Sequence, residues 1–264
     1  MEFTKVKVII LAAGQGSRLL PLTQNTPKAL LDIHGQTLIG RQIDAFAACG
    51  VRDFVVVTGF RPDLMDDALA RIAARNKVEI RTVYNPFYAV ADNLASCWMA
   101  RHEMTGDFIQ VNGDNVFRAD LARRLLRAND APVIAAVARK GAYDADDMKV
   151  IMHDDRLLRI GKKLPARDVN AEALGFYVFR GEGAARYRDM LESMIREPEG
   201  LHQWFPAAID RLASEMTIRT LDLSGLEWCE VDYPTDLALA RELAARWDEE
   251  KHRPRLVHPT RGQG

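Results

Sequence analysis

The order of apolar and polar positions divides the first half of the chain into alternating strands and helices. Residues 6–12 form a nearly continuous apolar run, which is typical of a buried strand. Residues 39–48 carry apolar side chains at helical spacing and predict a helix that ends at Gly50. Such alternation builds a mostly parallel sheet covered on both faces, so we expect an α/β fold. The same patterns predict strands at 54–58, 78–84, 108–111 and 133–137 and helices at 62–75, 93–103 and 121–128.

Beyond Lys140 the pattern changes to shorter extended segments. Two of them, 148–152 and 157–160, flank a polar stretch and predict a hairpin. From Asp248 onward apolar positions are few, so we expect residues 248–264 to form a polar tail, mobile or an interaction arm, outside the core. The remaining elements predicted here are strands at 174–179 and 227–231 and helices at 184–195, 202–214 and 234–247.

Length and composition fit one soluble globular unit. A chain of 264 residues, 48% of them hydrophobic, can bury a large core, so we predict a single domain over 1–247 with halves 1–140 and 141–247. The formal net charge of −1 offers no basic surplus for a nucleic acid. We therefore expect small-molecule partners and no nucleic acid, and the sequence is compatible with a homodimer.

The cysteines and the apolar runs indicate the compartment. Cys49, Cys97 and Cys229 are widely spaced and lie in apolar segments, so we expect buried side chains in a reducing environment rather than zinc ligands or disulfides. No apolar stretch reaches the roughly 18 residues of a membrane span, and no leader pattern precedes the first strand. The expectation is a cytoplasmic protein without a membrane partner.

The first strand runs into a loop that carries glycines and fixed positive charge. Gly14 and Gly16 can adopt turned conformations that a Cβ would forbid, and consecutive N–H groups in such a turn bind anionic oxygen. Arg18 adds a fork that suits two phosphate oxygens, and Lys28 follows ten residues later in Thr-Pro-Lys. We interpret this loop as the site of a nucleoside triphosphate.

Two other glycine loops and a purely structural turn are the alternatives to this interpretation. The spacing has Leu19 where a dinucleotide fingerprint has its third glycine, and no Gly-Lys-Ser/Thr follows as in a P-loop. A dinucleotide-dependent oxidoreductase would also need an acidic residue after the second strand, where the chain has Thr58-Gly59-Phe60. A plain turn would explain the glycines but neither Arg18 nor Lys28.

Two aspartates far apart in sequence predict a Mg²⁺ site. Asp114 follows a strand in Asn-Gly-Asp, and Asp232 follows another, so a parallel sheet brings both to its carboxyl edge. Alone, Asp114 would be interpreted as a turn residue. Asp236 lies in the first turn of the last helix, and we favour a capping role for it.

Five segments together resemble one family. Leu-Ala-Ala-Gly-x-Gly-Ser-Arg-Leu and Thr-Pro-Lys-Ala-Leu are similar to the opening motif of the sugar-nucleotidyltransferases. Residues 55–59, 112–114 and 228–237 resemble three later family motifs. The resemblance implies a three-layer α/β/α Rossmann-like nucleotidyltransferase fold with a mostly parallel mixed sheet. Its first half would bind nucleotide and its second half the acceptor.

The resemblance also implies roles for individual residues. Arg18 and Lys28 would act on the triphosphate, and Mg²⁺ on Asp114 and Asp232 would bridge donor and acceptor. A non-catalytic regulator of the same family would be expected to lose Lys28 or an aspartate, and this chain keeps them. The residues implied to contact nucleotide are Leu11, Ala12, Ala13, Gly14, Gly16, Ser17, Gly59, Asn93 and Ser96.

Asn93-x-x-Ser96 departs from the pattern of the glucose-1-phosphate enzymes. It is more similar to the small cytidylyltransferases that act on phosphocholine, aminoethylphosphonate and inositol phosphate, which favours CTP over UTP or dTTP as donor. The alternative is a UTP- or dTTP-dependent sugar-1-phosphate enzyme. Asn93 would equally serve to cap the helix that it begins.

The acceptor side is described by lysines and an aromatic and acidic group. Resemblance to the inositol- and choline-phosphate enzymes directs Lys162 toward acceptor phosphate, and Lys149 and Tyr177 join it as acceptor-binding candidates. Aromatic faces beside carboxylates would suit a quaternary ammonium. We favour the plainer interpretation, in which Trp204 and Phe205 are core and residues 144–147 form a solvated loop. The full group is Tyr143, Asp144, Asp146, Asp147, Tyr177, Trp204, Phe205 and Tyr233.

Overall fold

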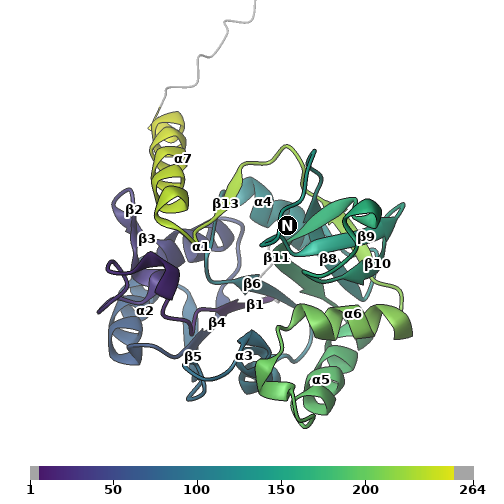
Figure 1. The fold of residues 1–264 in the computed structure, drawn as a ribbon. Coiled ribbons are helices and arrows are strands. Elements are labelled where there is room, and N and C mark those ends of the chain that lie inside the picture. Colours follow the sequence, from purple (N-terminus) through teal and green to yellow (C-terminus); the bar gives the residue numbers. More distant parts are fainter. Residues whose placement is uncertain (1–5, 253–264) are drawn as a thin grey trace, which may run out of the picture.

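The computed structural model describes residues 6–252 as a mixed sheet with helices packed against it (Figure 1). Its nine main strands are β1 (Lys7–Leu11), β4 (Asp53–Thr58), β5 (Glu79–Tyr84), β6 (Phe108–Asn112), β8 (Val133–Ala138), β9 (Lys149–His153), β10 (Arg156–Ile160), β11 (Ala171–Phe179) and β12 (Arg219–Asp222). Two short pairs accompany it, β2 (Asp32–Ile33) with β3 (Gln36–Thr37) and β7 (Asn115–Phe117) with β13 (Trp228–Glu230). The helices are α1 (Leu38–Ala47), α2 (Pro62–Asn76), α3 (Asn93–Met99), α4 (Ala119–Arg127), α5 (Glu182–Met194), α6 (Pro206–Glu215) and α7 (Pro234–His252).

The strand order is β5-β4-β1-β6-β11-β8-β12-β10-β9. The first four strands are parallel neighbours, and β11 runs antiparallel between β6 and β8. The hairpin predicted around residues 153–156 is confirmed, because β9 and β10 pair antiparallel across it. The expected α/β fold with a mixed sheet is thus confirmed.

Alternate residues of β1 enter two different cores. Val8 and Ile10 join a cluster with apolar residues of α1, α2 and α4, whereas Ile9 joins a second cluster with residues of α3, α5 and α6. Side chains of a strand point alternately to the two faces, so the helices form two separate outer layers. This is the three-layer arrangement expected from the alternation of elements.

A third cluster brings α7 to the loop that follows β1. Leu19 packs with Val231, Leu237 and Trp247, and all four side chains are buried. In Figure 1, α7 lies beside β13 and the β2–β3 pair. The last helix therefore fixes the loop and the segment after β13 against each other.

Three predicted helix boundaries were wrong. Helix α3 ends at Met99, and residues 100–103 form a 3-10 turn. Helix α6 begins at Pro206, because residues 200–202 form a separate 3-10 turn. Helix α7 continues to His252, so the predicted tail does not begin at Asp248. The Asp248 carboxylate pairs with the guanidinium of Arg41 at 2.8 Å, which anchors this last part of the helix. Residues 253–264 of the predicted tail lie outside the described residues.

Two further expectations concern burial and length. Cys97 and Cys229 are buried and Cys49 is half-buried, all three with free thiols, so the expectation of full burial was wrong for Cys49 alone. Within residues 6–252, no helix has both the length and the apolar character needed to cross a bilayer.

Candidate active site

The loop after β1 is held between the ends of two neighbouring strands. Ala12 N–H donates to Val57 O at 2.9 Å, and Phe60 N–H donates to Ala13 O at 3.0 Å. A Cβ on Gly59 would lie 2.6 Å from Ala13 O, so only glycine permits this contact. The predicted nucleotide residues Leu11, Ala12, Ala13 and Gly59 therefore meet at the carboxyl edge of the parallel strands.

The glycine-rich part of the loop leaves its backbone donors unused. Among the described residues, the N–H groups of residues 14–17, which include Ser17, donate no hydrogen bond to the protein. A Cβ on Gly14 would meet no atom within 4 Å, so the loop borders open space there. Gly16 is left-handed with φ 80°, whereas Gly14 has no positive φ, so the predicted turned conformation holds only for Gly16. Consecutive free N–H groups are suited to anionic oxygen.

Lys28 lies between the two predicted metal aspartates. Its Nζ is 2.9 Å from Asp114 Oδ2 and 2.6 Å from Asp232 Oδ1. Burial alone would lower the pKa of Lys28, but the carboxylates of Asp114 and Asp232 outweigh it and raise that pKa above its ordinary value. The lysine is therefore a fixed cation at physiological pH.

Arg18 reaches the carboxylate of Asp232 from the outer side. Its Nη2 is 3.0 Å from Asp232 Oδ2, and its guanidinium lies 5.2 Å from the centroid of the Tyr233 ring. Tyr233 in turn donates from its hydroxyl to Asp146 Oδ2 at 3.3 Å. Arg18, Tyr233 and Asp146 thus form a rim beside the predicted metal aspartates.

Glu230 joins the two aspartates, and it was not among the residues predicted from the sequence. The three carboxylates offer oxygens within 4.8 Å of one another. The β7–β13 pair brings them together, because Val231 N–H donates to Asp114 O at 3.0 Å. Glu230 and Asp232 are two residues apart at the end of a strand, and residues at that spacing share a face. That spacing was the signal available in the sequence.

The charge around Glu230 changes its acidity. The negative charge of Asp114, then burial, then Asp232 raise the pKa of Glu230 to about 8, and Lys28 and Arg18 offset part of this shift. The Glu230 side chain still reaches solvent while lying among these groups. Three carboxylates so close together repel one another unless a cation accompanies them.

The carboxylate cluster of Asp114, Glu230 and Asp232 fits a divalent cation. Magnesium prefers oxygen ligands and binds through a few carboxylates together with phosphate oxygens and water. Asp114 Oδ1 is buried and has no hydrogen-bond partner among the described residues. An acceptor oxygen buried without a partner is costly, and a bound cation would satisfy it.

Asp236 confirms the capping interpretation. Its Oδ2 accepts hydrogen bonds from the backbone N–H groups of Asp232 at 3.0 Å and Tyr233 at 2.7 Å. A carboxylate in the first turn satisfies donors that the helix leaves free. Asp236 therefore also fixes the backbone from which Asp232 extends.

Asn93 and Ser96 make contacts inside the protein. Asn93 Oδ1 accepts from Phe205 N–H at 2.9 Å, and the N-cap of α3 is Asp92, so Asn93 does not cap the helix. Ser96 is buried and its hydroxyl accepts from Asn85 Nδ2 at 3.0 Å. Their contact with nucleotide remains a prediction.

The acceptor-side residues divide into three kinds. Tyr177 is 1% exposed and packs edge-on against Phe205, so its prediction as an acceptor contact was wrong: the ring belongs to the core. Lys149 is also buried, and its Nζ donates to the backbone carbonyls of Asp144 and Lys162, so it braces two loops instead of facing the acceptor. Lys162 alone keeps a reachable ammonium, 3.9 Å from the centroid of the Trp204 ring.

The aromatic and acidic group is also divided. Phe205 is core as predicted, but Trp204 is 39% exposed, so its assignment to the core was wrong. The Asp144 and Asp146 side chains are exposed, as a solvated loop requires, whereas Asp147 is half-buried and pairs with Lys140 at 2.8 Å. The loop is therefore anchored at one end and open at the other.

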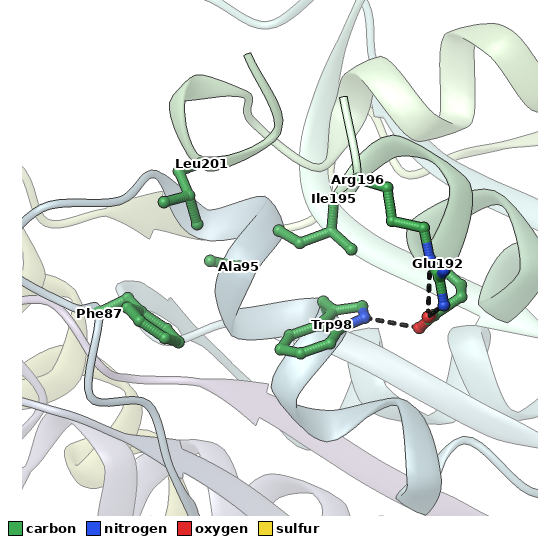
Figure 2. Close-up of a pocket in the computed structure, with 7 residues that line it drawn as sticks. All are labelled: Phe87, Ala95, Trp98, Glu192, Ile195, Arg196 and Leu201. Carbon is green, nitrogen blue, oxygen red and sulfur yellow. Dashed lines mark hydrogen bonds and ion pairs between the residues drawn. The ribbon is translucent and has the colours of Figure 1, made fainter. Parts of the chain in front are cut away.

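A separate apolar hollow lies between α3 and α5 (Figure 2). It has a volume of about 400 Å³, and Trp98 Nε1 donates to Glu192 Oε2 at its edge, at 2.7 Å. None of its lining residues was predicted as a site residue. They are Phe87, Ala95, Trp98, Glu192, Ile195, Arg196 and Leu201.

Comparisons with known proteins agree with the fold and the motifs. The chain is 24% identical over 257 residues to the CTP:phosphoglutamine cytidylyltransferase of Campylobacter jejuni, covering 90% of this chain and 100% of that protein. It is 34% identical over 123 residues to the choline-phosphate cytidylyltransferase of Streptococcus pneumoniae, covering 45% of this chain and 51% of that protein. The solved inositol-1-phosphate CTP transferase of T. maritima superposes with a TM-score of 0.77 at 21% identity, over 94% of this chain and 98% of that one.

The family assignment rests on a longer match. The family model of the MobA-like NTP transferase domain matches residues 8–211, which include the opening loop, Lys28 and Asp114. The chain spans all of the Campylobacter relative but only about half the length of the Streptococcus relative. The matched range covers most of the chain, and the resemblance to nucleotidyltransferases is confirmed. This chain therefore belongs to the family of the MobA-like NTP transferase domain.

Proposed function

We propose that this protein transfers a cytidylyl group from CTP to a small phosphorylated acceptor and releases pyrophosphate. The observation that carries the proposal is the position of Lys28, bonded to both Asp114 and Asp232 beside the free N–H groups of the opening loop. Three relatives that use CTP or make cytidylyl products, from Campylobacter, Streptococcus and T. maritima, support cytosine as the base.

The triphosphate is bound by the opening loop and its two cations. The N–H groups of residues 14–17 bind phosphate oxygens, and Arg18 holds the β- and γ-phosphates. Lys28 stabilises negative charge on the oxygens of the α-phosphoryl group. These groups are in place before the reaction, so they need little reorganisation as charge develops.

The transfer is a single displacement at phosphorus. A phosphate oxygen of the acceptor attacks the α-phosphorus of CTP in line, a new P–O bond forms, and the bond to the bridging oxygen of the β-phosphate breaks. Pyrophosphate leaves with the electron pair of that bond. The acceptor phosphate is already an anion at neutral pH, so the protein needs no general base and contributes positioning and electrostatic stabilisation.

Asp114, Glu230 and Asp232 are the residues that would hold Mg²⁺. When bound, the ion supplies charge neutralisation and a common anchor for donor and acceptor phosphates. The protein contributes the carboxylates, and Asp236 fixes the backbone of Asp232.

Lys162 is the residue proposed to meet the acceptor. Its ammonium lies 3.9 Å from the centroid of the Trp204 ring, and Trp204 neighbours Phe205, whose N–H donates to Asn93 Oδ1. These contacts link the lysine to Asn93, a predicted nucleoside residue, and support its proposed role toward the acceptor. A compact cation on a flexible stem suits a phosphate monoester.

A pyrophosphate-release assay tests the proposal. The protein is incubated with Mg²⁺, one of CTP, UTP or dTTP, and one of phosphocholine, inositol 1-phosphate, aminoethylphosphonate or glucose 1-phosphate. We expect release with CTP and at least one of the first three acceptors. Release only with UTP or dTTP and the sugar phosphate would replace the proposed donor and acceptor, and no release with any pair would overturn the transferase proposal.

A further inference from the structure

Three of the four carboxylate oxygens of Asp114 and Asp232 are already paired with side-chain cations of the protein. Lys28 Nζ forms ion pairs with Asp114 Oδ2 at 2.9 Å and with Asp232 Oδ1 at 2.6 Å. Arg18 Nη2 forms an ion pair with Asp232 Oδ2 at 3.0 Å. Only Asp114 Oδ1 is buried without a partner among the described residues of the cluster. A metal ion bound to Asp114 Oδ2 or Asp232 Oδ1 would have to displace the ammonium of Lys28.

Lys28 and a divalent cation would compete for these carboxylates. Like charges repel strongly where solvent screening is weak, and only 13% of the Lys28 side chain is exposed. Arg18 is a second cation beside the cluster and adds to this repulsion, whereas the third carboxylate, Glu230, attracts a metal ion when it is ionised. A metal ion is therefore disfavoured while Lys28 remains on the aspartates.

Lys28 has limited freedom to withdraw into solvent. A Cβ on Gly16 would lie 2.9 Å from Lys28 Cβ and 3.0 Å from its Cδ, so the stem of the lysine passes directly under the opening loop. The same loop presents the free N–H groups of residues 14–17. A phosphate bound to those N–H groups would lie beside the lysine and offer its ammonium new anionic partners.

We propose that Lys28 is the resident cation of the carboxylate cluster in the nucleotide-free protein, and that a divalent metal and a triphosphate bind with positive coupling. This inference rests on the proposed function, because the triphosphate is the ligand that takes Lys28. The phosphate draws the ammonium away and opens the carboxylates to metal. Metal binding in turn frees Lys28 for the phosphate, and the two couplings are equal because linkage is reciprocal.

The test is a titration with Mn²⁺, followed by electron paramagnetic resonance of the free ion, in the absence of acceptor. Wild type, Lys28→Met and Lys28→Arg are titrated with and without a CTP analogue that has a methylene bridge between its α- and β-phosphates. Methionine keeps the length of the stem and removes the charge, whereas arginine keeps a charge. Circular dichroism and thermal unfolding establish that each variant is folded.

We expect Lys28→Met without nucleotide to bind Mn²⁺ at least tenfold more tightly than wild type, and Lys28→Arg to bind as weakly as wild type. The analogue is expected to tighten Mn²⁺ binding at least tenfold in wild type and much less in Lys28→Met. Equal Mn²⁺ affinities of wild type and Lys28→Met would overturn the inference.

Arg18→Gln is a second variant for the same titration, with its fold checked in the same way. It removes the outer cation alone and is expected to tighten Mn²⁺ binding less than Lys28→Met. If no variant binds Mn²⁺ at millimolar concentration, the cluster is not a metal site and the inference fails. The pyrophosphate assay tests the transferase function independently. If wild type releases pyrophosphate but binds Mn²⁺ as tightly as Lys28→Met, the inference about Lys28 fails and the transferase function stands.

Discussion

Gly16 and Lys28 are in such close contact that the glycine determines where the lysine lies. A Cβ on Gly16 would be 2.9 Å from Lys28 Cβ, and Gly16 has φ 80°, a conformation that L residues rarely adopt. Thr23 holds the turn by donating from its hydroxyl to Gly16 O at 2.7 Å. The conformation of the opening loop at Gly16 therefore fixes the position of the Lys28 side chain.

Gly16→Ala should lower kcat about tenfold or more, because the new methyl group pushes Lys28 away from the aspartates. The left-handed conformation alone should cost roughly 1–2 kcal/mol of unfolding free energy. Gly35→Ala is a matched control, since Gly35 has φ 78° and a Cβ added there would meet no atom within 4 Å. Kinetics and denaturant unfolding of both variants separate the effect of backbone strain from that of displacing Lys28. An equal loss of activity in both variants would contradict the proposed effect of the contact between residue 16 and Lys28.

Lys28→Met and Asp114→Ala should each abolish most turnover while the fold persists. Removing one preorganised donor such as Lys28 typically costs about 10²–10³-fold in rate, and we expect a loss of that order for the proposed metal ligand Asp114 as well. Steady-state pyrophosphate release with saturating CTP measures the loss. Near-normal activity of either variant would exclude that residue from the mechanism. Lys163→Ala, at a position that reaches solvent, is the control for loss of a lysine charge.

Glu230→Gln tests the carboxylate that was not predicted from the sequence. We expect the Mg²⁺ concentration for half-maximal activity to rise several-fold, with a smaller change in kcat at saturating Mg²⁺, because one anionic ligand is lost and two remain. Glu242→Gln on the exposed face of α7 is the matched control. An unchanged Mg²⁺ requirement in Glu230→Gln would show that only the aspartates hold the ion.

Lys162→Ala should raise KM for the phosphorylated acceptor about tenfold and leave KM for CTP within about twofold, since the loss of one charge-assisted phosphate contact is local. Its ammonium lies over the ring of Trp204. Lys163→Ala is expected to leave both constants near wild type. A rise in KM for CTP instead would assign Lys162 to the nucleotide.

Asp248→Asn tests whether the extension of α7 stabilises the fold. Arg41 is buried, and its guanidinium also donates to the carbonyls of Ile33 and His34, at 2.7 and 3.0 Å. Removing the partner charge should cost about 1–3 kcal/mol of unfolding free energy. Glu249→Gln, at the exposed neighbouring position, should stay within about 0.5 kcal/mol of wild type in the same denaturant titration. Equal stabilities would mean that this end of α7 adds nothing.

Much of the architecture followed from local patterns. The apolar run of β1, the helical spacing of α1 and the turn between β9 and β10 are properties of neighbouring residues, and each was predicted near its observed bounds. The loop with Gly16, Arg18 and Lys28 could also be predicted from the sequence, because its glycines and its two cations lie close together in the chain. Asp114 and Asp232 were paired by assuming that both follow strands of one parallel sheet. This was right for Asp114, which follows β6, but wrong for Asp232, which follows β13 in a separate antiparallel pair with β7.

Other features were decided by tertiary packing. Tyr177 and Lys149 lie on strands, and the pattern of residues along a strand does not show whether α6 or a loop covers a given face of the sheet. Both side chains proved to be buried. Trp204 was expected inside but lies at the surface under Lys162, since the helix begins only after it, at Pro206.

By itself, then, the sequence determined the α/β alternation, the glycine-rich opening loop and its two cations, because these depend on residues close together in the chain. Only the tertiary structure decided that Glu230 joins Asp114 and Asp232, and that Lys28 lies among them. The reason is physical: these contacts join residues as far apart as 204 positions, and the spacing of Glu230 and Asp232 does not by itself show that β13 pairs with β7 beside Asp114.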